Sequence, residues 1–412
     1  MNRTYHPLRS LQAGHWFKLI CGASFQHLPI VRNLALACTL AGVDCIDVSA
    51  DSAVVLAAWE GIQAAQSFLE QARDRGIQTH GSPWVMVSLN DGEDPHFRKA
   101  QFDAATCPPD CPRPCEAICP TQAIVASQSS SYAYHSRATL TEGVIASRCY
   151  GCGRCVTQCP YERISTYSYV TSPSAIAPLV LEGVDALEIH TQPGRFVEFC
   201  RLWQAILPWV GHLKVIAISC PDGDGVVDYL RSLYAVMAPL PCPLIWQTDG
   251  RPMSGDIGNG TTHAAIQLGQ RVLAAKLPGY VQLAGGTNGY TVKKLRELGL
   301  LPDITKSQPS AATPSALQNT HPISSPAHIA GIAYGSYLRS LLAPIFDKLD
   351  AIGIVQVNHY PLSSNAYVDT PIHLSKPAST HLEAYPELLW EAVRIAHSLV
   401  KQLKHQSPVV SS

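Results

Sequence analysis

The chain has no excess of charge of either sign. Lysine and arginine number 30 against 31 aspartates and glutamates, so 412 residues carry a formal net charge of −1. A protein this close to neutrality has no long-range field that attracts nucleic acid or an acidic membrane surface. We therefore expect no nucleic-acid partner.

Long apolar runs are also missing. No stretch approaches the roughly 18 consecutive apolar residues of a membrane span. The N-terminus, MNRTYHPLRSLQAGHW, has no apolar core like that of a signal peptide. Eight of the 14 cysteines fall in two tight groups, a pattern typical of metal ligation in a reducing compartment. We expect a cytoplasmic protein without a membrane span.

Short apolar runs alternate with helical patterns along most of the sequence. Nearly continuous apolar runs are typical of strands that are buried on both faces of a parallel sheet. The expected strands are 17–24, 43–50, 84–90, 184–191, 213–220, 243–250, 280–288 and 327–334. The expected helices include Pro29 to Ala41, Ala53 to Arg75 and Arg195 to Leu207.

Eight strand–helix steps in one direction predict a (β/α)8 barrel-like α/β domain with an inserted ferredoxin-like module. The alternative fold is an open doubly wound parallel sheet. The predicted division is a barrel-like domain split over 1–90 and 175–348, a two-cluster insert at 91–174, a flexible Ser/Pro-rich loop at 303–326, and a C-terminal extension at 349–412 with a helix about 386–403.

The second group of cysteines has the spacing of bacterial ferredoxins. It reads Cys149-x2-Cys152-x2-Cys155-x3-Cys159-Pro. Three closely spaced thiolates can wrap one iron–sulfur cube from a tight loop. The glycines between them help the backbone make that loop.

The first group repeats only the last half of this pattern. It reads Cys107-x3-Cys111-x3-Cys115-x3-Cys119-Pro, with three residues between successive cysteines. Prolines before Cys115 exclude a helical cysteine stripe and favour an extended wrap. The fourth cysteine of each run in two-cluster ferredoxins binds the other cluster. We therefore expect two [4Fe–4S] clusters, one held by Cys107, Cys111, Cys115 and Cys159, the other by Cys149, Cys152, Cys155 and Cys119.

The alternative for these cysteines is a pair of structural zinc sites. Zinc motifs usually join C-x2–4-C pairs across a longer gap, which two four-cysteine runs fit poorly. The remaining cysteines lie in apolar segments and are interpreted as buried small hydrophobes: 21, 38, 45, 200, 220 and 242.

In a barrel, the ends of the strands would bring polar residues to the ligand-binding face. These are Asp51, Asn90, Asp91, His190, Cys220, Asp222, Asp249, Arg251 and Asn288. We interpret Asp51 and Asp222 as helix N-caps, and His190 as a loop histidine satisfied by hydrogen bonds. Gly285, Gly286, Gly335 and Ser336 follow the last two strands, where barrels often bind a phosphate, so a flavin mononucleotide is one candidate ligand.

Beyond the cysteines, the sequence resembles one known family. The segments concerned are CGASFQHLP (21–29), AGVDCIDVSAD (41–51), VSLNDGEDPHFRKAQFD (87–103), RCYGCGRC (148–155), EGVDALEIHTQPGR (182–195), QTDGRPMSGDIGNGTTHAA (247–265) and QLAGGTNGYT (282–291). Together with the Cys107 motif they resemble the light-dependent period protein family of cyanobacteria. The resemblance implies an iron–sulfur protein that conveys light-dependent redox state to the circadian clock, with KaiA, CikA and SasA among its partners.

Two functional hypotheses remain open. One is a non-catalytic redox sensor that exchanges electrons with the photosynthetic pool, directly with a quinone or through a carrier. The other is an oxidoreductase in which electrons pass to a flavin or substrate at the barrel mouth. The sequence shows no glycine-rich dinucleotide fingerprint after an early strand and no lysine at the end of a candidate strand, which favours the sensor.

Overall fold

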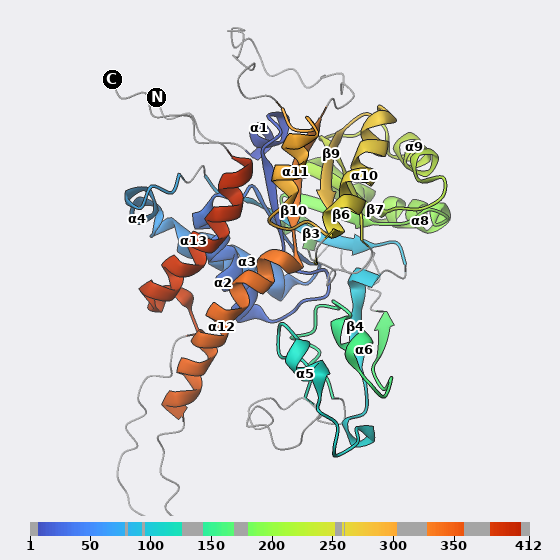
Figure 1. Ribbon diagram of the computed structural model, residues 1–412. Helices are drawn as coiled ribbons and strands as arrows, with labels where there is room; N and C mark the ends of the chain where they lie inside the picture. Colours follow the sequence, from blue (N-terminus) through green and yellow to red (C-terminus); the bar gives the residue numbers. More distant parts are fainter. Residues whose placement is uncertain are drawn as a thin grey trace, which may run out of the picture.

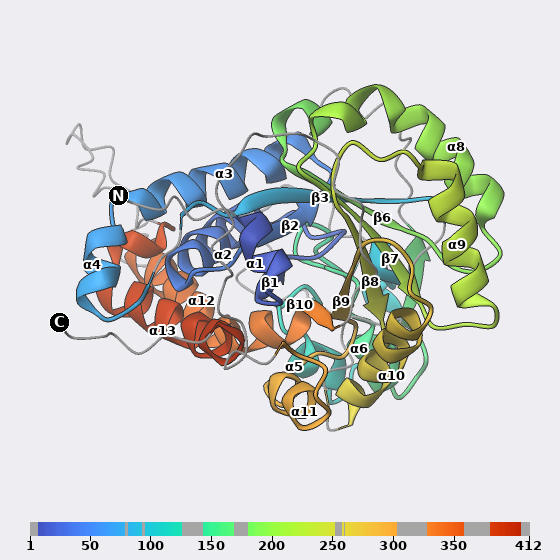
Figure 2. The same ribbon diagram turned by 90° about the horizontal axis from the view of Figure 1, so that it is seen from above.

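The barrel is closed. The computed structural model describes residues 7–78, 81–92, 95–125, 143–168, 180–251, 258, 260–302, 328–357 and 380–404. Its parallel strands are β1 (Trp16–Ile20), β2 (Cys45–Ser49), β3 (Trp84–Asn90), β6 (Ala186–His190), β7 (Val215–Pro221), β8 (Leu244–Asp249), β9 (Tyr280–Ala284) and β10 (Ile329–Tyr334). They pair in the order β1-β10-β9-β8-β7-β6-β3-β2, and β1 also pairs with β2 (Figure 2).

The predicted (β/α)8 barrel is therefore confirmed. Each of the eight expected apolar runs overlaps one barrel strand. The open doubly wound sheet is wrong, because β1 has a hydrogen-bonded neighbour on both sides. The run at 280–288 is strand only as far as Ala284, since Gly285 and Gly286 adopt φ values of 62° and 101° that turn the chain.

Helices cover the outside of the barrel (Figure 1). They are α1 (Pro7–Gln12), α2 (Leu28–Ala41), α3 (Ser52–Gln66), α4 (Leu69–Asp74), α8 (Phe196–Ile206), α9 (Val226–Met237), α10 (Thr261–Ala274), α11 (Thr291–Glu297), α12 (Ser336–Val357) and α13 (Pro386–Leu403). Short 3-10 turns are η1 (Pro95–Phe97), η2 (Ala104–Thr106), η4 (Leu181–Gly183), η5 (Leu207–His212) and η6 (Leu382–Ala384). None of the described helices has the length and apolar character needed to cross a membrane.

Local signals explain the helix ends. Gly42 ends α2 with a left-handed φ of 90°, and its amide donates to the carbonyls of Cys38 and Thr39. Asp51 caps α3 by accepting hydrogen bonds from the amides of Ala53 and Val54, as predicted. The N-cap prediction for Asp222 is wrong, because the N-cap of α9 is Gly225 and Asp222 pairs with Arg271.

Helices α2 and α3 touch at Gly61. A Cβ there would overlap the carbonyl oxygen of Arg32 and lie 2.9 Å from the Cβ of Ala35. We expect Gly61→Ala to lower the free energy of unfolding by about 1–3 kcal/mol, because the helices would have to move apart. Urea denaturation measures the loss. The exposed Gln63→Ala on the same helix should change stability by less than about 0.5 kcal/mol, and equal losses in the two variants would contradict this account.

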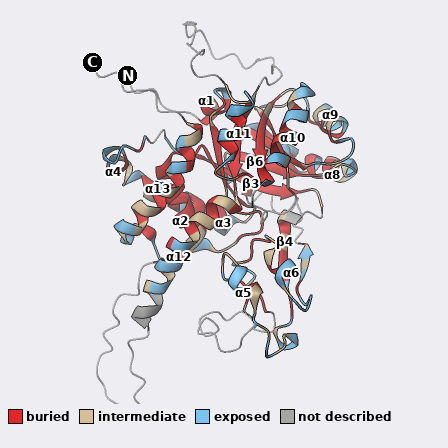
Figure 3. Ribbon diagram, in the orientation of Figure 1, coloured by how far each residue is buried: buried red, intermediate tan, exposed pale blue. Residues whose placement is uncertain are grey.

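The interior of the barrel has an apolar floor and a polar mouth. At the N-terminal ends of the strands, Trp16 and Trp84 meet edge to face at 5.8 Å, with Met86, Val215 and other apolar residues around them. Towards the C-terminal ends, charged and amide side chains replace the apolar ones. Figure 3 shows that the strands are buried almost throughout.

The cysteine-rich segment leaves the barrel after β3 and returns before β6. It contains β4 (Arg98–Gln101) paired antiparallel with β5 (Ser165–Ser168), and two short helices, α5 (Pro114–Ile118) and α6 (Arg154–Gln158). Figure 1 shows these elements grouped at one end of the barrel. The segment has its own small apolar core, which includes Phe102, Ile124 and Ile164. The boundaries proposed for the insert, 91 and 174, stay predictions.

The C-terminal helix lies where the sequence predicted it, at Pro386–Leu403. It packs against α2 and α12, and Lys404 just after it forms an ion pair of 2.7 Å with Asp44. Helix α12 continues without a break past residue 348, where we expected the extension to begin. The Ser/Pro-rich segment 303–326 and the tail from residue 405 lie outside the described residues.

Candidate functional site

The two cysteine motifs have the same local conformation. Arg113 and Gly153, each two residues before the third cysteine of its motif, have left-handed φ values of 53° and 74° and begin α5 and α6. Gln122 and Glu162, each three residues after the fourth cysteine, have φ values of 50° and 51°. The looser spacing of the first motif therefore changes only its first half, and the structure contains an internal repeat around α5 and α6.

Electrostatic interactions relate the motif cysteines in two sets, the Cys107 group and the Cys149 group. In the first, Cys107 interacts electrostatically with Cys111 and Cys159, and Cys115 with Cys159. In the second, Cys152 and Cys155 both interact with Cys149 and with Cys119. Four sulfur donors are the number that a [4Fe–4S] cluster or a zinc ion accepts. Which four cysteines hold each cluster stays a prediction.

Backbone amides point at several of these sulfurs. The amide of Ala123 donates to Cys119 Sγ at 3.1 Å, and that of Arg163 to Cys159 Sγ at 3.4 Å. In both motifs the donor is the residue four positions after the fourth cysteine. Burial would raise the pKa of Cys159, but the amides around it outweigh that effect and lower the pKa. Burial raises the pKa of Cys155 to about 12. A bound metal is what would keep this buried sulfur ionised.

The second motif is docked on the barrel mouth. Tyr150, between Cys149 and Cys152, is 3 % exposed and lies under the guanidinium of Arg339 from α12, 4.1 Å from the ring centre. On the insert side, Lys99 donates hydrogen bonds to Gln26 Oε1 at 2.9 Å and to the carbonyl of Ala146. The Cys149 group is therefore held against the barrel. Cys107 and Cys111 of the other group are both partly exposed.

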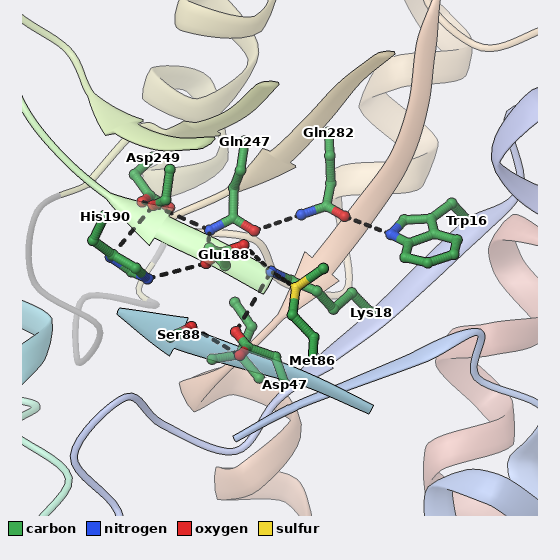
Figure 4. A network of polar contacts seen from close by, with 12 residues as sticks. Trp16, Lys18, Asp47, Met86, Ser88, Glu188, His190, Gln247, Asp249 and Gln282 are labelled. Carbon is green, nitrogen blue, oxygen red and sulfur yellow. Dashed lines mark hydrogen bonds and ion pairs between the residues drawn. The ribbon is translucent and has the colours of Figure 1, made fainter. Parts of the chain in front are cut away.

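A buried ion-pair network fills the mouth of the barrel (Figure 4). Lys18 from β1 is fully buried, and its Nζ pairs with Glu188 of β6 and lies 3.5 Å from Asp47 Oδ2 of β2. Burial would lower the pKa of Lys18, but the two carboxylates outweigh it and raise the pKa above its ordinary value. Glu188 Oε1 lies 3.0 Å from His190 Nε2. The ammonium is thus held in its charged form.

Amide side chains continue the network towards the floor. Gln247 Nε2 donates to Glu188 Oε1 at 2.8 Å, and Gln282 Nε2 donates to Gln247 Oε1 at 2.5 Å. Trp16 Nε1 closes the chain by donating to Gln282 Oε1 at 2.6 Å. Consecutive hydrogen bonds of this kind fix the orientation of each charged group in the mouth.

Sequence reasoning missed most of this network. The inward residues Lys18, Asp47, Glu188, Gln247 and Gln282 are polar residues that interrupt apolar runs, and that interruption was the available signal. We interpreted most of the runs only as nearly continuous in apolar residues. His190 is not a loop residue, because it is the last residue of β6 and 5 % exposed.

The four residues predicted to bind a phosphate line one pocket. Gly285, Gly286, Gly335 and Ser336 surround it together with Arg339. His96, His190 and Asp249 line its other side. Arg339 donates to Ser336 Oγ at 3.0 Å and to the carbonyl of Ile20. Whether a phosphate binds there stays a prediction.

The other predicted positions have structural explanations. Asp91 pairs with Arg195 at 3.2 Å, and Asn288 accepts from the amide of Tyr290 at 2.9 Å. Of the six cysteines outside the motifs, Cys21, Cys38, Cys45 and Cys220 are buried, and Cys200 and Cys242 are partly buried.

Two models of known protein families match the cysteine-rich segment and the part of the chain that follows it. Residues 107–170 match the model of the LdpA Fe–S cluster-binding domain, and residues 179–402 match that of the light dependent period A C-terminal domain. The chain is 44 % identical to light dependent period A of Synechococcus elongatus over 400 residues, which cover 97 % of this chain and 94 % of that protein.

Among solved structures, fructose-bisphosphate aldolase of Campylobacter jejuni aligns over 96 % of this chain and 90 % of its own, with a TM-score of 0.37 and 7 % identity. Two family models match the chain, and the identity to light dependent period A extends over 97 % of it. The chain therefore belongs to the light dependent period A family and carries that family's iron–sulfur cluster-binding domain.

Proposed function

We propose that this protein is a redox sensor with two [4Fe–4S] clusters, and that it conveys light-dependent redox state to the circadian clock from the cytoplasm. The observation that supports the proposal is that Cys159 interacts electrostatically with Cys107 of the first motif, and Cys119 with Cys155 of the second. We infer that each motif gives its fourth cysteine to the other cluster. This exchange is the ligand pattern of two-cluster ferredoxins. Independent zinc sites have no need of it.

The bound cofactor would supply one-electron redox chemistry. The two cysteine groups would have different roles, one in electron exchange and one in acting on the barrel. The partly exposed Cys107 and Cys111 face the side from which a carrier or a quinone would approach. The Cys149 group lies against the barrel, where Tyr150 contacts Arg339. A change of charge at this second group would act on a buried guanidinium in the barrel mouth, because Coulomb energies are large where water is excluded.

We propose that this change alters the surface that binds the clock proteins KaiA, CikA and SasA. Polar contacts join the insert to the barrel beside aromatic ones, such as Arg148 to Asp350 at 3.9 Å and Lys99 to Gln26. Polar contacts of this kind are sensitive to a nearby charge. The relative of this chain carries "light dependent period" in its name, which supports a connection with the clock.

Cys152→Ala tests the ligand assignment. We expect iron and acid-labile sulfide per chain to fall by about half after anaerobic purification, because one cube loses a ligand and the other keeps all four. The matched control is Cys220→Ala, a buried cysteine outside both motifs, which should keep the full content. A colourless parent protein that contains zinc would contradict the proposal.

The sensor role has a separate test. Binding to KaiA, CikA and SasA is measured with the protein oxidised and reduced, for the parent and for Cys152→Ala. We expect the affinity for at least one partner to change on reduction in the parent and not in the variant. Affinities that are unchanged by both reduction and the substitution would refute the sensor.

One observation favours a second candidate function, an oxidoreductase. Arg339 lines the glycine-lined pocket, and its guanidinium also covers the ring of Tyr150. A flavin there would receive electrons over a short path. Flavin fluorescence in the supernatant of heat-denatured protein is the test, and its absence from protein with full cluster content removes this candidate.

A further inference from the structure

Two histidines and an aspartate meet at the barrel mouth, away from all eight motif cysteines. They are His96 of η1, His190 at the end of β6 and Asp249 at the end of β8. One ligand atom from each lies within 4.8 Å of the others. His190 and Asp249 are buried, and His96 is partly buried. Two imidazoles and one carboxylate are a common ligand set of zinc and non-haem iron sites that keep further positions open.

We propose that His96, His190 and Asp249 bind a divalent transition-metal ion, and that this ion and Arg339 together hold a small anionic ligand in the glycine-lined pocket. The metal site and its ligand are separate from the cysteine groups. The proposal rests on four features of the mouth: the ligand set, the residues that orient it, the balance of charge, and the shape of the pocket beside it.

The orienting residues are already in place. His190 Nε2 lies 3.0 Å from Glu188 Oε1, which leaves Nδ1 on the side of Ser219, 3.4 Å from its Oγ. Ser219 Oγ also donates to Asp249 Oδ2. A carboxylate behind a histidine and a hydroxyl behind a carboxylate are the outer contacts that fix metal ligands in orientation. Glu188 is itself held by Lys18 and Gln247.

The charge of the mouth favours a cation. Three carboxylates are buried there, those of Asp47, Glu188 and Asp249. The buried cations are Lys18 and Arg339. With all three carboxylates ionised and the histidines neutral, the negative charges exceed the positive ones by one. A divalent ion would change the net charge of these buried groups from −1 to +1. An anion in the pocket would balance that positive charge, because unbalanced buried charge is costly.

The pocket beside the site is suited to an anion. His96, His190 and Asp249 line it on one side, and Gly285, Gly286 and Thr287 on the other. Backbone amides near glycines can approach an oxyanion closely. Arg339 adds a guanidinium that is fixed by Ser336 and by Tyr150. The chemical class of ligand is thus a carboxylate or phosphate group, bound to the metal at one end and to Arg339 at the other.

The site would also connect the insert to the barrel. His96 lies two residues before β4, which leads into the first cysteine motif, whereas His190 and Asp249 belong to barrel strands. Phe97 already packs edge to face on His190 at 5.2 Å. Zinc–nitrogen distances are about 2.0–2.1 Å, and the three ligand atoms lie within 4.8 Å of one another, close enough to share one ion.

The experiment is a zinc titration of the purified protein with its iron–sulfur content intact, followed by calorimetry under anaerobic conditions. We expect one zinc ion per chain in the parent protein. His96→Gln and Asp249→Asn should each weaken binding at least tenfold, by loss of a ligand. The matched control is His263→Gln, an exposed histidine on α10, which should bind zinc as the parent does. His96→Gln changes a partly exposed side chain, so it keeps the test valid if Asp249→Asn fails to fold.

X-ray absorption at the zinc edge identifies the ligands without interference from iron. We expect only nitrogen and oxygen neighbours. Sulfur neighbours would assign the zinc to the motif cysteines and overturn the proposal, as would equal affinity in His96→Gln and His263→Gln or no binding by the parent.

Inorganic phosphate is the probe for the anion, and it should bind more tightly with zinc present. Phosphate binding that is unaffected by zinc overturns the second half of the proposal. Cys152→Ala should still bind zinc at the mouth, so failure of the cluster assignment is distinguished from failure of this site.

Discussion

Lys18→Met is expected to lower the free energy of unfolding by about 3–5 kcal/mol, the usual cost of removing one partner of a buried ion pair. Lys18 is fully buried and is the cation between Glu188 and Asp47. Methionine has a similar length but carries no charge. Both carboxylates would therefore stay buried in the barrel without the ammonium group that pairs with them. Urea denaturation, followed by tryptophan fluorescence, measures the loss.

The double variant Lys18→Met/Glu188→Gln is the matched control. It removes one charge of each sign, so it should lose less stability than Lys18→Met alone. A single variant that stays within about 1 kcal/mol of the parent would contradict the account of Lys18 as the charge that balances the mouth.

The cost of Lys18→Met should depend on pH. Burial opposes ionisation of Glu188, but Lys18 and His190 lower its pKa from the ordinary 4.5 to about 2. In the parent, this depressed pKa gives stability that is full above pH 4.5 and is lost as the pH falls towards 2. Without Lys18, burial makes Glu188 take up a proton more readily. The difference between parent and variant should therefore be smaller at pH 5 than at pH 8.

Gly151→Ala is expected to remove about half of the iron and sulfide from the protein. Gly151 lies between Cys149 and Cys152, has a φ of 74°, and a Cβ there would overlap the carbonyl oxygen of Arg98 in β4. A methyl group thus adds about 1–2 kcal/mol of backbone strain and also pushes the loop away from β4. Both effects displace the neighbouring sulfurs. Iron and sulfide analysis after anaerobic purification gives the result.

Gly225→Ala is the control that separates the effect of backbone strain from the effect of pushing the cysteine loop away from β4. Gly225 has a similar φ of 69° at the start of α9, and nothing lies within 4 Å of its added Cβ. This variant should lose some stability and keep its full iron content. Iron loss in both variants, or in neither, would show that the close approach of Gly151 to Arg98 does not control the cluster loop.

The sequence alone determined the strands, the cysteine motifs and several helix ends. Apolar runs long enough for one strand each predicted all eight barrel strands, because a strand buried on both faces needs apolar residues at nearly every position. Asp51 marked the start of α3 correctly, since capping depends on neighbours in the chain. The cysteine motifs together with the segments that flank them led to the family, which the comparisons confirmed.

Only the tertiary structure decided which residues meet inside the barrel. Lys18 and Glu188 are 170 positions apart, and a polar residue within an apolar run gives no indication of its partner. Closure of the sheet places β1 beside β10, and it turns alternate residues of every strand towards one axis. The same closure brings His96 from the insert to His190 and Asp249. Local sequence controls backbone conformation through short-range sterics and hydrogen bonds, but contacts between distant side chains depend on how the whole chain packs.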